Sequence, residues 1–512
     1  MFDTLPPPSI LAAWRPTPPR AKPDRPPSTI HRPPWIWFLL GLLVVAGCGG
    51  TAPDEGRQPQ RQPLAGISLK LTIIGDPALA KAIGRLRGEW NLQTGADFQV
   101  LSVNESKVSQ PDTFQADAVI GPSYLIGSAA EQGRITPLSK EQLHNASGGW
   151  SDVFELVRRH EVAWGTQTWA VPFGSPVLVC YCRADLLEKL DRQPPQTWGE
   201  YLELARLLAD RKVFGKDGLA KNAAWYGTVE PLDSGWAGLV LLAHAASYAK
   251  HWDNYSTLFR IDTMEPLVAG PPFVKALEDL VAAAKLGPSD ALDFDPDGAR
   301  NAFWQGRCGM ALSWPTSAVA VPSDSARKGL RVVFSELPGA ERAYNVGDQK
   351  WEYRTEDQDP HVPLLVVAGR IGAVCAVSSH TNAALELLSW LSASPADEPL
   401  SAASSATTLY RRSHFKSAKD WVEKPVPPAA ASQYAALTEK TLRRSQWLMA
   451  LRIPGRDEYL AALDHAVRRA VQSKQSPEEA LREAAKKWRE ITDRLGRERQ
   501  RPAYLRSLEL EP

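Results

Sequence analysis

The sequence predicts an α/β fold in which mainly parallel sheets carry helices on their faces. Residues 67–74 and 98–103 are short runs of β-branched and aliphatic side chains, which is typical of strands. The segment between them repeats its apolar residues at the spacing of a helix, and residues 116–121 form a third apolar run. Strand, helix and strand in this order indicate βαβ units with parallel neighbouring strands.

The first 66 residues differ in composition from the rest of the chain. Residues 1–34 are rich in proline and arginine, and we expect a disordered tail there. Residues 35–48, WIWFLLGLLVVAGC, are apolar and uncharged, but shorter than the roughly 17–25 residues of a comfortable membrane span. Such a run between basic and small residues is typical of a secretory signal core. We interpret residues 49–66, rich in Gly, Pro, Gln and Arg, as a solvated linker.

The end of this signal core, Val45-Ala46-Gly47-Cys48, resembles the lipobox of bacterial lipoproteins. In that motif the peptide is cleaved before the cysteine, and the cysteine thiol carries a lipid. The resemblance implies lipidation of Cys48, with the mature chain anchored to a membrane by its amino terminus. The alternative is a short transmembrane anchor in which the cysteine has no role.

A helix is predicted directly after the strand at residues 67–74. Asp76 is a favourable N-cap residue, and Pro77 suits the first helical position. The loops at residues 75–76 and 121–124 each follow a parallel strand, so both lie at the carboxyl edge of the sheet. Ligands of open α/β sheets bind along that edge. The apolar face of the predicted helix consists of Leu79, Ile83, Leu86 and Trp90.

A further strand is predicted at residues 177–182, followed by a capped helix. Thr197 and Glu200 have the spacing of a capping box, in which two side chains satisfy open backbone donors at a helix start. Near the end of the chain, residues 464–499 are charged and helical by pattern. No heptad repeat persists there, so we interpret them as lobe-packing, solvent-facing helix rather than a coiled coil.

Composition excludes several classes of protein. Of the 512 residues, 44% are hydrophobic and 23% charged, which is typical of a globular protein long enough for two domains. The formal net charge of +1 indicates no strong attraction to nucleic acid or to an anionic membrane surface. The 18 tryptophans are unusual, because tryptophan supplies both core volume and flat faces for ligand stacking.

Four cysteines follow Cys48 in the sequence. Cys180 and Cys182 alternate along a predicted strand, so their side chains share one face, and a bond between such near neighbours is expected to be strained. Pairing with Cys308 or Cys375 is compatible with an extracytoplasmic chain. Four free buried thiols are equally compatible with the sequence.

Catalytic and cofactor motifs do not occur in this sequence. It contains no H-E-x-x-H, G-x-S-x-G, Walker or C-x-x-C pattern, and its nine histidines are scattered singly. We therefore expect no metal, no cofactor and no enzymatic activity. Carboxylates are numerous, so an extracytoplasmic glycosidase stays an alternative, although nothing in their placement favours a catalytic pair.

Four segments in a fixed order resemble one known family. Residues 171–200 contain V-P-F-G, a strand, R-A-D-L-L and P-P-Q-T-W-G-E, and residues 297–314 contain A-F-W-Q-G-R-C-G-M-A-L-S-W. Residues 371–391 and the helix start at Ser476-Pro-Glu-Glu complete the pattern. Together they resemble the extracellular solute-binding proteins of ABC transporters, in the maltose-binding-protein-like branch. The resemblance covers residues 67–495.

The resemblance implies two α/β lobes that are joined by hinge strands and close around a solute. Lobe one is expected at residues 67–178 and 312–375, lobe two at 179–311 and 376–500, and a carboxy-terminal tail at 501–512. The chain is expected to cross between the lobes near residues 177–182, 309–314 and 373–378. A disulfide among the cysteines beside these crossings would stiffen the hinge.

Candidate solute-binding residues follow from these positions. Asp76 and Tyr124 lie in loops after strands, Gly174 and Ser175 precede the first crossing, and Trp314 ends the second. For most of them a capping or core role is at least as good an explanation. The loop after Val119 lacks the acidic and basic pair of the maltodextrin binders, and Ser175-Pro176 stands where they have an acid, which disfavours maltodextrin. The ligand-binding candidates are Asp76, Tyr124, Gly174, Ser175, Trp236, Trp314 and Trp351.

The expected function is capture of a small solute, a carbohydrate in view of the family branch, for delivery to an ABC permease. The protein is expected to be a lipid-anchored monomer on the periplasmic face of a bacterial membrane. A degenerate family member that acts as a sensor or surface interaction module is the main alternative, and the glycosidase is a more remote one.

Overall fold

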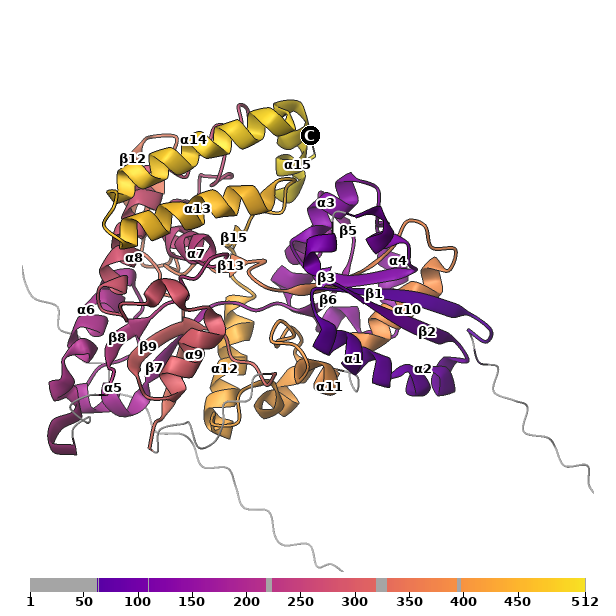
Figure 1. Cartoon of the computed structure of the whole chain (residues 1–512), viewed down its shortest axis with the longest axis horizontal. Helices are drawn as coiled ribbons and strands as arrows, with labels where there is room; N and C mark the ends of the chain where they lie inside the picture. Colours follow the sequence, from indigo (N-terminus) through magenta and orange to yellow (C-terminus); the bar gives the residue numbers. More distant parts are fainter. Residues whose placement is uncertain are drawn as a thin grey trace, which may run out of the picture. The chain divides into compact units, whose positions relative to one another are not determined.

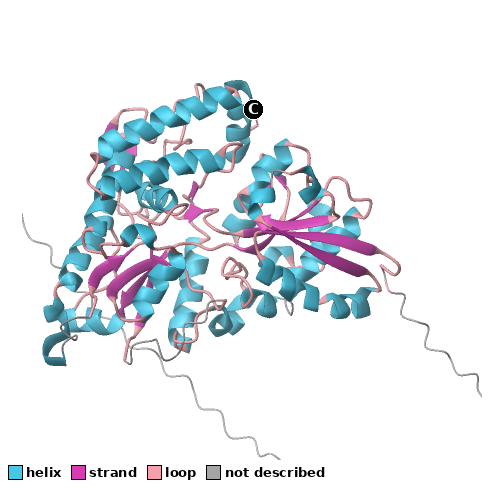
Figure 2. Cartoon of the chain, viewed as in Figure 1, coloured by secondary structure: helices cyan, strands magenta, loops and turns pink. Residues whose placement is uncertain are grey.

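Two mixed β-sheets, each covered by helices, form the frame of the protein in a computed structural model (Figures 1 and 2). The structure describes residue 62 and residues 64–108, 110–217, 223–318, 329–393 and 397–511. The predicted tail, signal core, lipidated Cys48 and most of the linker lie outside these residues. Within the described ranges, no helix has the length and apolar character needed to cross a membrane.

The first sheet contains the predicted βαβ strands. Its central strand pairs in parallel with a neighbour on each side, with Leu71 opposite both Val100 and Ala118. The order across the sheet is β2 (Asp97–Val103), β1 (Ser68–Ile74), β3 (Ala118–Pro122), β14 (Arg370–Val374) and β6 (Val171–Gly174).

Helices cover both faces of this sheet, because successive apolar side chains of β3 point to opposite faces and each face must be covered. Ala118 and Ile120 face a core that contains Trp90 and Trp390, whereas Val119 faces the opposite core. The first core is closed by α1 (Pro77–Arg85), α2 (Arg87–Thr94), α4 (Lys140–Asn145) and α10 (Thr381–Leu391), and the second by α3 (Leu125–Glu131).

The second sheet has the order β10 (Val332–Glu336), β7 (Val179–Arg183), β9 (Cys308–Ser313) and β8 (Tyr226–Val229). Tyr181 and Phe334 face one core, and Cys180 and Met310 face the other. The surrounding helices are α5 (Ala184–Leu190), α6 (Trp198–Ala209), α7 (Ala237–Ala249), α8 (Pro271–Ala284), α9 (Pro296–Trp304), α12 (Pro428–Thr441), α13 (Arg456–Val471), α14 (Pro477–Leu495) and α15 (Arg497–Ser507).

Shorter elements connect these layers. A π-helical turn, Val157–Glu161, precedes the hairpin of β4 (Ala163–Trp164) and β5 (Gln167–Thr168). The remaining short elements are 3₁₀ turns at Glu105–Lys107, Pro111–Phe114, Trp150–Asp152, Arg211–Asp217, Ala291–Asp293 and Ser413–Trp421, helix α11 (Asp397–Ser401), and strands β11 (Arg342–Asn345) and β12 (Lys350–Tyr353).

The α/β two-lobed fold is confirmed, but the sheets are mixed rather than mainly parallel. In the described part of the chain, three pairings within the two large sheets are parallel and four are antiparallel. The antiparallel pairings involve β6, β7, β10 and β14. The chain enters β7 from the first sheet and enters β14 from the side of the second sheet. Each of these two strands therefore runs antiparallel to its neighbours.

Sheet membership differs from the predicted division at three places. β10 pairs with β7 in the second sheet, although residues 312–375 were expected in lobe one. Helix α10 packs on β14 and β3 of the first sheet, although residue 376 was expected to begin a lobe-two segment. Residues 501–507 continue α15 instead of forming a tail, because Tyr504 is buried and its hydroxyl accepts hydrogen bonds from the N–H groups of Leu258 and Phe259.

The chain passes from the first sheet to the second through residues 175–178, and returns through residues 366–369. The segment 309–314, expected as a crossing, is largely β9 of the second sheet, and 373–378 begins inside β14. Between the sheets, β13 (Leu364–Leu365) pairs in parallel with β15 (Leu448–Met449) (Figure 1).

The predicted helix caps are present. The Asp76 carboxylate accepts a hydrogen bond from the Leu79 N–H at 2.9 Å, with Pro77 at the first helical position. Ser476 and Glu479 form the complete capping box of α14. At α6, Thr197 accepts from the Glu200 N–H, whereas the Glu200 carboxylate accepts from the Gln196 N–H rather than from that of Thr197.

Replacing Gly227 with alanine should destabilise the second lobe. A Cβ at Gly227 in β8 would lie 2.1 Å from the backbone carbonyl oxygen of Ala205 in α6, and a helix backbone cannot yield locally. We expect a loss of about 2–3 kcal/mol in the free energy of unfolding, measured by urea denaturation.

Gly84→Ala is the control, since Gly84 is exposed in α1 with nothing within 4 Å of its Cβ position. It should be neutral or stabilising by up to about 1 kcal/mol. Equal effects of the two substitutions would contradict the packing of β8 against α6.

Candidate functional site

One edge of the first sheet gathers polar groups from four strands. Asp76 and Tyr124 follow the parallel strands β1 and β3, so they share the carboxyl edge. β14 runs antiparallel and begins at this edge, with Arg370 opposite Pro122 of β3 and Gly174 of β6. The structure therefore places Asp76, Tyr124 and Gly174 at one sheet edge; the strand order predicted this edge for Asp76 and Tyr124.

The second sheet presents a corresponding edge. Trp314 follows the carboxyl end of β9, where Ser313 lies opposite Val179, the first residue of β7. Trp236 immediately precedes α7, and its ring centroid lies 5.6 Å from that of Trp314. Residues 175–178 run directly from Gly174 at the first edge to Val179 at the second. The two edges therefore adjoin, and the space between them is the candidate solute cleft.

Asp76 is almost fully occupied by protein groups. One carboxylate oxygen caps α1, and the other accepts a hydrogen bond from the Ser404 hydroxyl at 2.5 Å. The Arg370 Nε lies 3.6 Å from the same oxygen. Only 9% of the Asp76 surface is exposed. The carboxylate therefore holds helix α1, β14 and the 401–408 region together at one point.

Trp314 is 3% exposed and also contacts this region. Its indole N–H donates to the Ser405 carbonyl oxygen at 2.8 Å, and its own carbonyl accepts from Arg300 at 2.9 Å. The same stretch of chain that meets Asp76 at the first edge thus meets Trp314 at the second.

An open cavity of about 320 Å³ lies where the loop after β3 meets the start of α13. The Arg456 guanidinium carbon lies 3.8 Å from the centre of the Tyr124 ring, a cation–π contact across the cleft. The Tyr124 hydroxyl donates to the Glu105 carboxylate. Burial, reinforced by Glu105, raises the pKa of Tyr124, so this phenol stays protonated. The other lining residues include Ser128, Gln132, Arg134, Arg452, Asp457 and Glu458.

The charged groups around this cavity mostly have protein partners. Arg456 pairs with Asp457 at 2.7 Å, Glu458 pairs with Arg494, and Arg452 donates to backbone carbonyls. Such a lining offers an aromatic face together with oriented donors and acceptors, and little uncompensated charge. This chemistry suits a small neutral molecule with several hydroxyl groups.

Ser175 contributes to the hinge rather than to open space. It is 2% exposed, and its hydroxyl donates to the Glu161 carboxylate. Glu161 ends the π-helical turn and lies beside Gly369, where a Cβ would be 2.5 Å from the Glu161 Oε1, 2.8 Å from the Gly174 carbonyl oxygen and 2.9 Å from the Ser123 hydroxyl. Complete burial raises the pKa of Glu161 to about 7. The carboxyl group thus contacts both connections between the sheets.

Gly174 allows the closest backbone approach in the cleft. A Cβ at this position would lie 2.0 Å from the Ala406 carbonyl oxygen and 2.6 Å from the Thr407 Cα. The sequence indicated a glycine facing the cleft, and the structure places another segment of the chain against it.

Trp351 is separated from the other candidates. It lies in β12 of the β11–β12 hairpin and contacts Tyr248 near the end of α7, whereas Trp236 precedes the first turn of that helix. Twelve helical residues span roughly 18 Å. Arg342 lies over the Trp351 ring at 5.0 Å, so the indole packs within its own hairpin.

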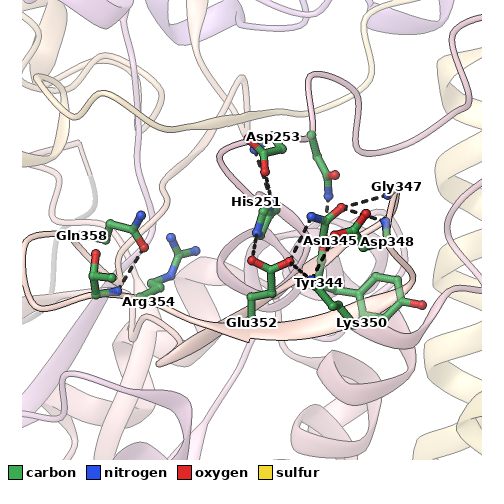
Figure 3. Close-up of polar contacts among 12 residues, drawn as sticks. His251, Asp253, Tyr344, Asn345, Gly347, Asp348, Lys350, Glu352, Arg354 and Gln358 are labelled. Carbon is green, nitrogen blue, oxygen red and sulfur yellow. Dashed lines mark hydrogen bonds and ion pairs between the residues drawn. The ribbon is translucent and has the colours of Figure 1, made fainter.

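The hairpin is attached to the loop after α7 by a polar cluster (Figure 3). His251 lies 3.4 Å from Glu352 through Nε2, and its Nδ1 accepts from the Asp253 N–H at 3.1 Å. Asn345 donates to Glu352 and accepts from the N–H groups of Gly347 and Asp348. These contacts are local to the hairpin and the loop, which explains Trp351 as a packing residue.

Several cleft residues were missed by the sequence reasoning. Glu105, Arg370 and Arg456 approach Tyr124 or Asp76 from distant parts of the chain. Glu105 follows β2 at the same edge, so strand order contained a signal for it. Arg370 and Arg456 gave no such signal, because β14 and α13 reach the cleft only through the tertiary fold.

The four described cysteines are free and buried, so no hinge disulfide is present among them. Cys180 and Cys182 share a face as expected, with their sulfurs 3.5 Å apart. Among the described residues, no group of three or more His, Cys, Asp or Glu side chains is placed to hold a metal ion.

Known proteins share the sequence pattern and the fold of this chain. Residues 93–398 match the sequence profile of the family described as bacterial extracellular solute-binding protein. No curated protein sequence matches the chain.

Solved structures share the fold. An ABC transporter solute-binding protein from Agrobacterium radiobacter K84, in complex with ribitol, is 19% identical with a TM-score of 0.61, over 84% of this chain and 100% of that one. Maltose-bound MalE3 of T. maritima is 17% identical with a TM-score of 0.59, over 83% and 100%. The sugar-binding protein MalE of Xanthomonas citri is 16% identical with a TM-score of 0.60, over 84% and 98%. At such identities the likeness establishes the fold alone.

Titration of Glu161 should make stability fall as pH rises. The folded-state pKa of about 7 exceeds the ordinary 4.5, so between these values the native state binds more protons than the unfolded state. Glu161→Gln removes this titration. We expect the free energy of unfolding of E161Q, relative to the unsubstituted protein, to rise by about 2–3 kcal/mol between pH 5 and pH 8, measured by urea denaturation. The exposed substitution Glu498→Gln is the control, and it should change the gap far less. A pH-independent gap for E161Q would contradict the burial of this carboxyl group.

Proposed function

We propose that this chain, which belongs to the bacterial extracellular solute-binding protein family, captures a small carbohydrate or polyol between its two lobes and delivers it to an ABC transporter permease. Members of this family bind solutes and are not enzymes, and they act outside the cytoplasm. The proposal concerns the class of solute, the site that holds it and the attachment of the protein to a membrane.

The observation that carries the proposal is the cavity between Tyr124 and the first turn of α13. It lies between the loop and helix that follow β3 and the residues that lead into α13, which packs on α7 of the second lobe, so closure of the lobes would bury a solute there. An aromatic ring from one lobe and an arginine from the other form its walls. Its volume of about 320 Å³ is at the lower end of the range of small-molecule sites, which favours a small solute.

A neutral solute rich in hydroxyl groups fits the chemistry of the walls. The paired Arg456 and Asp457 side chains, Ser128 and Gln132 offer donors and acceptors for hydroxyl groups, and Tyr124 offers an apolar face. Proteins of the same fold have been solved with ribitol, D-mannitol and maltose, which supports a polyol or sugar here. Asp76, Gly174, Trp236 and Trp314 lie at the adjoining sheet edges, Ser175 lies at the hinge, and Trp351 in β12 contacts the far end of α7.

The proposed attachment to the membrane is a lipid on Cys48, from the lipobox-like sequence that precedes the globular part. A lipid on the amino terminus and a linker of residues 49–66 would let both lobes move freely at the periplasmic surface of the membrane. The protein would then act as a tethered monomer beside its permease.

Solute binding is tested by thermal unfolding of the full chain, in detergent, with polyols, monosaccharides, oligosaccharides, amino acids and peptides. A ligand at a hundred times its Kd stabilises the native state by about 2.7 kcal/mol, which shifts the melting temperature measurably. We expect a shift with a sugar or polyol and none with amino acids or peptides. A shift only with peptides or amino acids, or with no compound, would reject the proposed solute class.

Replacing Tyr124 with alanine should weaken binding of the solute identified in that screen. Loss of the ring removes its stacking face and the partner of Arg456, and we expect about a tenfold higher Kd by isothermal titration calorimetry. Tyr353→Ala is the matched control, because Tyr353 is 72% exposed on the β11–β12 hairpin. Equal affinity of the Y124A and Y353A proteins would move the site away from this cavity.

Membrane attachment is tested by Cys48→Ser. We expect the unsubstituted protein in the membrane fraction of the producing bacterium with a diacylglyceryl mass on its amino terminus, and the C48S protein without that mass. Persistence of the same mass in C48S would exclude Cys48 as the lipidated residue, and its absence from the unsubstituted protein would favour the transmembrane-anchor alternative.

A further inference from the structure

The region between Asp76 and Trp314 is filled by the protein's own chain. Residues Ser404, Ser405, Ala406 and Thr407, here called the 404–407 segment, follow α11 and enter the space between the two sheet edges. At one end the Ser404 hydroxyl donates to Asp76, and at the other the Ser405 carbonyl accepts from the Trp314 indole. One short stretch therefore contacts both lobes.

The segment is a tight turn with close packing on one side. The Thr407 N–H donates to the Ser404 carbonyl at 3.0 Å, and the Ala406 N–H donates to the Ser404 hydroxyl at 3.3 Å. Ala406 and Thr407 lie against Gly174, which has no side chain to hold them off. Only the absence of a Cβ at Gly174 lets the turn approach so closely.

The residues after the segment attach it to the first lobe. The Tyr410 carbonyl accepts from the Phe154 N–H at 3.0 Å, and the Tyr410 hydroxyl donates to the Ser392 carbonyl at 2.7 Å. Arg411 donates to the Gly148 carbonyl and to the Ser392 hydroxyl. Leu409, in contrast, lies in the core that contains Tyr181 and Phe334 of lobe two, so both lobes hold the chain that follows the segment.

The groups that the segment occupies are those that a sugar would use. A carboxylate and an indole face are the usual partners of sugar hydroxyl groups and sugar rings. Here Asp76 binds a serine hydroxyl, and Trp314, 3% exposed, lies between the segment and Trp236. A second sugar ring cannot reach Trp314 while the segment holds this position.

Two hydroxyl groups, at the end of the segment and directly after it, are buried without a protein partner. Thr407 and Thr408 are 4% and 1% exposed, and neither hydroxyl has a hydrogen-bond partner among the described residues. Unpaired buried hydroxyl groups disfavour the conformation that contains them.

We propose that the 404–407 segment sets the upper size of the solute, so that the protein accepts one monosaccharide or open-chain polyol and excludes oligosaccharides. The inference rests on the proposed function and names the substrate class of the same cleft. Asp76 and Tyr124 follow the neighbouring parallel strands β1 and β3 at one sheet edge. The cavity on the Tyr124 side can hold a single small solute, and the space on the Asp76 side, toward Trp314, is taken by the segment.

The test is isothermal titration calorimetry of the full chain, in detergent, with ribitol, mannitol, glucose, maltose and maltotetraose. We expect at least one polyol or monosaccharide to bind, and maltose and maltotetraose to bind at least a hundredfold more weakly. Comparable affinity for the small and the large sugars would overturn the inference while leaving the proposed function intact. Absence of binding to every carbohydrate would reject the proposed function, and the inference with it.

A triple variant examines the segment directly. Ser404→Gly, Ser405→Gly and Ala406→Gly together remove the hydroxyl that binds Asp76 and make the folded turn entropically less favourable. We expect maltose to bind at least tenfold more tightly than to the unsubstituted protein. The control combines Ala402→Gly and Ala403→Gly, which add two glycines just before the segment and leave its contacts in place. The control should keep the original size limit.

The milder substitution Ser404→Ala keeps the test decisive if the triple variant fails to fold. It should raise maltose affinity severalfold, because it removes the bond to Asp76 and the bond from the Ala406 N–H but adds no glycine to the turn. If the variants fold, as judged by cooperative thermal unfolding, and still reject maltose as strongly as the control does, the segment does not set the size limit.

Discussion

The short connection between β6 and β7 constrains the rest of the structure. Gly174 ends one sheet edge and Val179 begins the other, so five Cα–Cα steps separate them. An extended chain of that length spans at most about 18 Å. The loops after β1 and β3 and the end of β9 are consequently held near one another. A cleft with walls from two separate sheets follows from this single covalent distance.

The interior beside this connection leaves little freedom for substitution. Three oxygen atoms, from Glu161, Gly174 and Ser123, crowd the position that a Cβ of Gly369 would occupy. Arg452 lies behind them and donates to the carbonyls of Glu161 and Ala163. Burial lowers the pKa of Arg452 to about 10, and the backbone carbonyls replace the water it has lost. The hinge is therefore a polar and tightly packed junction with a buried acid whose charge changes near neutral pH.

Tryptophan abundance was a poor guide to the cleft, for a physical reason. The indole ring is large enough to dominate a core, and in this chain most of the described tryptophans do so. Trp198 stacks on His244 at 3.6 Å inside lobe two, and Trp90 packs on Trp390 inside lobe one. Trp314 lies at the predicted edge, yet its N–H is satisfied by the chain itself. Position along a strand placed Trp314 at the sheet edge where it lies, whereas residue type alone did not identify accessible rings.

The sequence by itself determined the local elements and the edge at which polar groups collect. Periodicity, Asp76 and Pro77 specified the first strand and helix, because these depend on side-chain alternation and on capping of nearby backbone donors. The ordered motifs in residues 171–200 and 297–314 indicated the family and hence two lobes.

Only the tertiary structure decided which distant segments meet at the cleft. β10 pairs with the second sheet and α10 packs on the first, each the opposite of what was expected. The apolar pattern of such a strand or helix is compatible with either sheet. Arg456 reaches Tyr124, and Ser404 reaches Asp76, across more than 300 residues of sequence. Such contacts depend on how the chain crosses between the sheets. Local sequence patterns do not specify where the chain crosses. The filled and the open parts of the cleft could therefore be distinguished only in the folded structure.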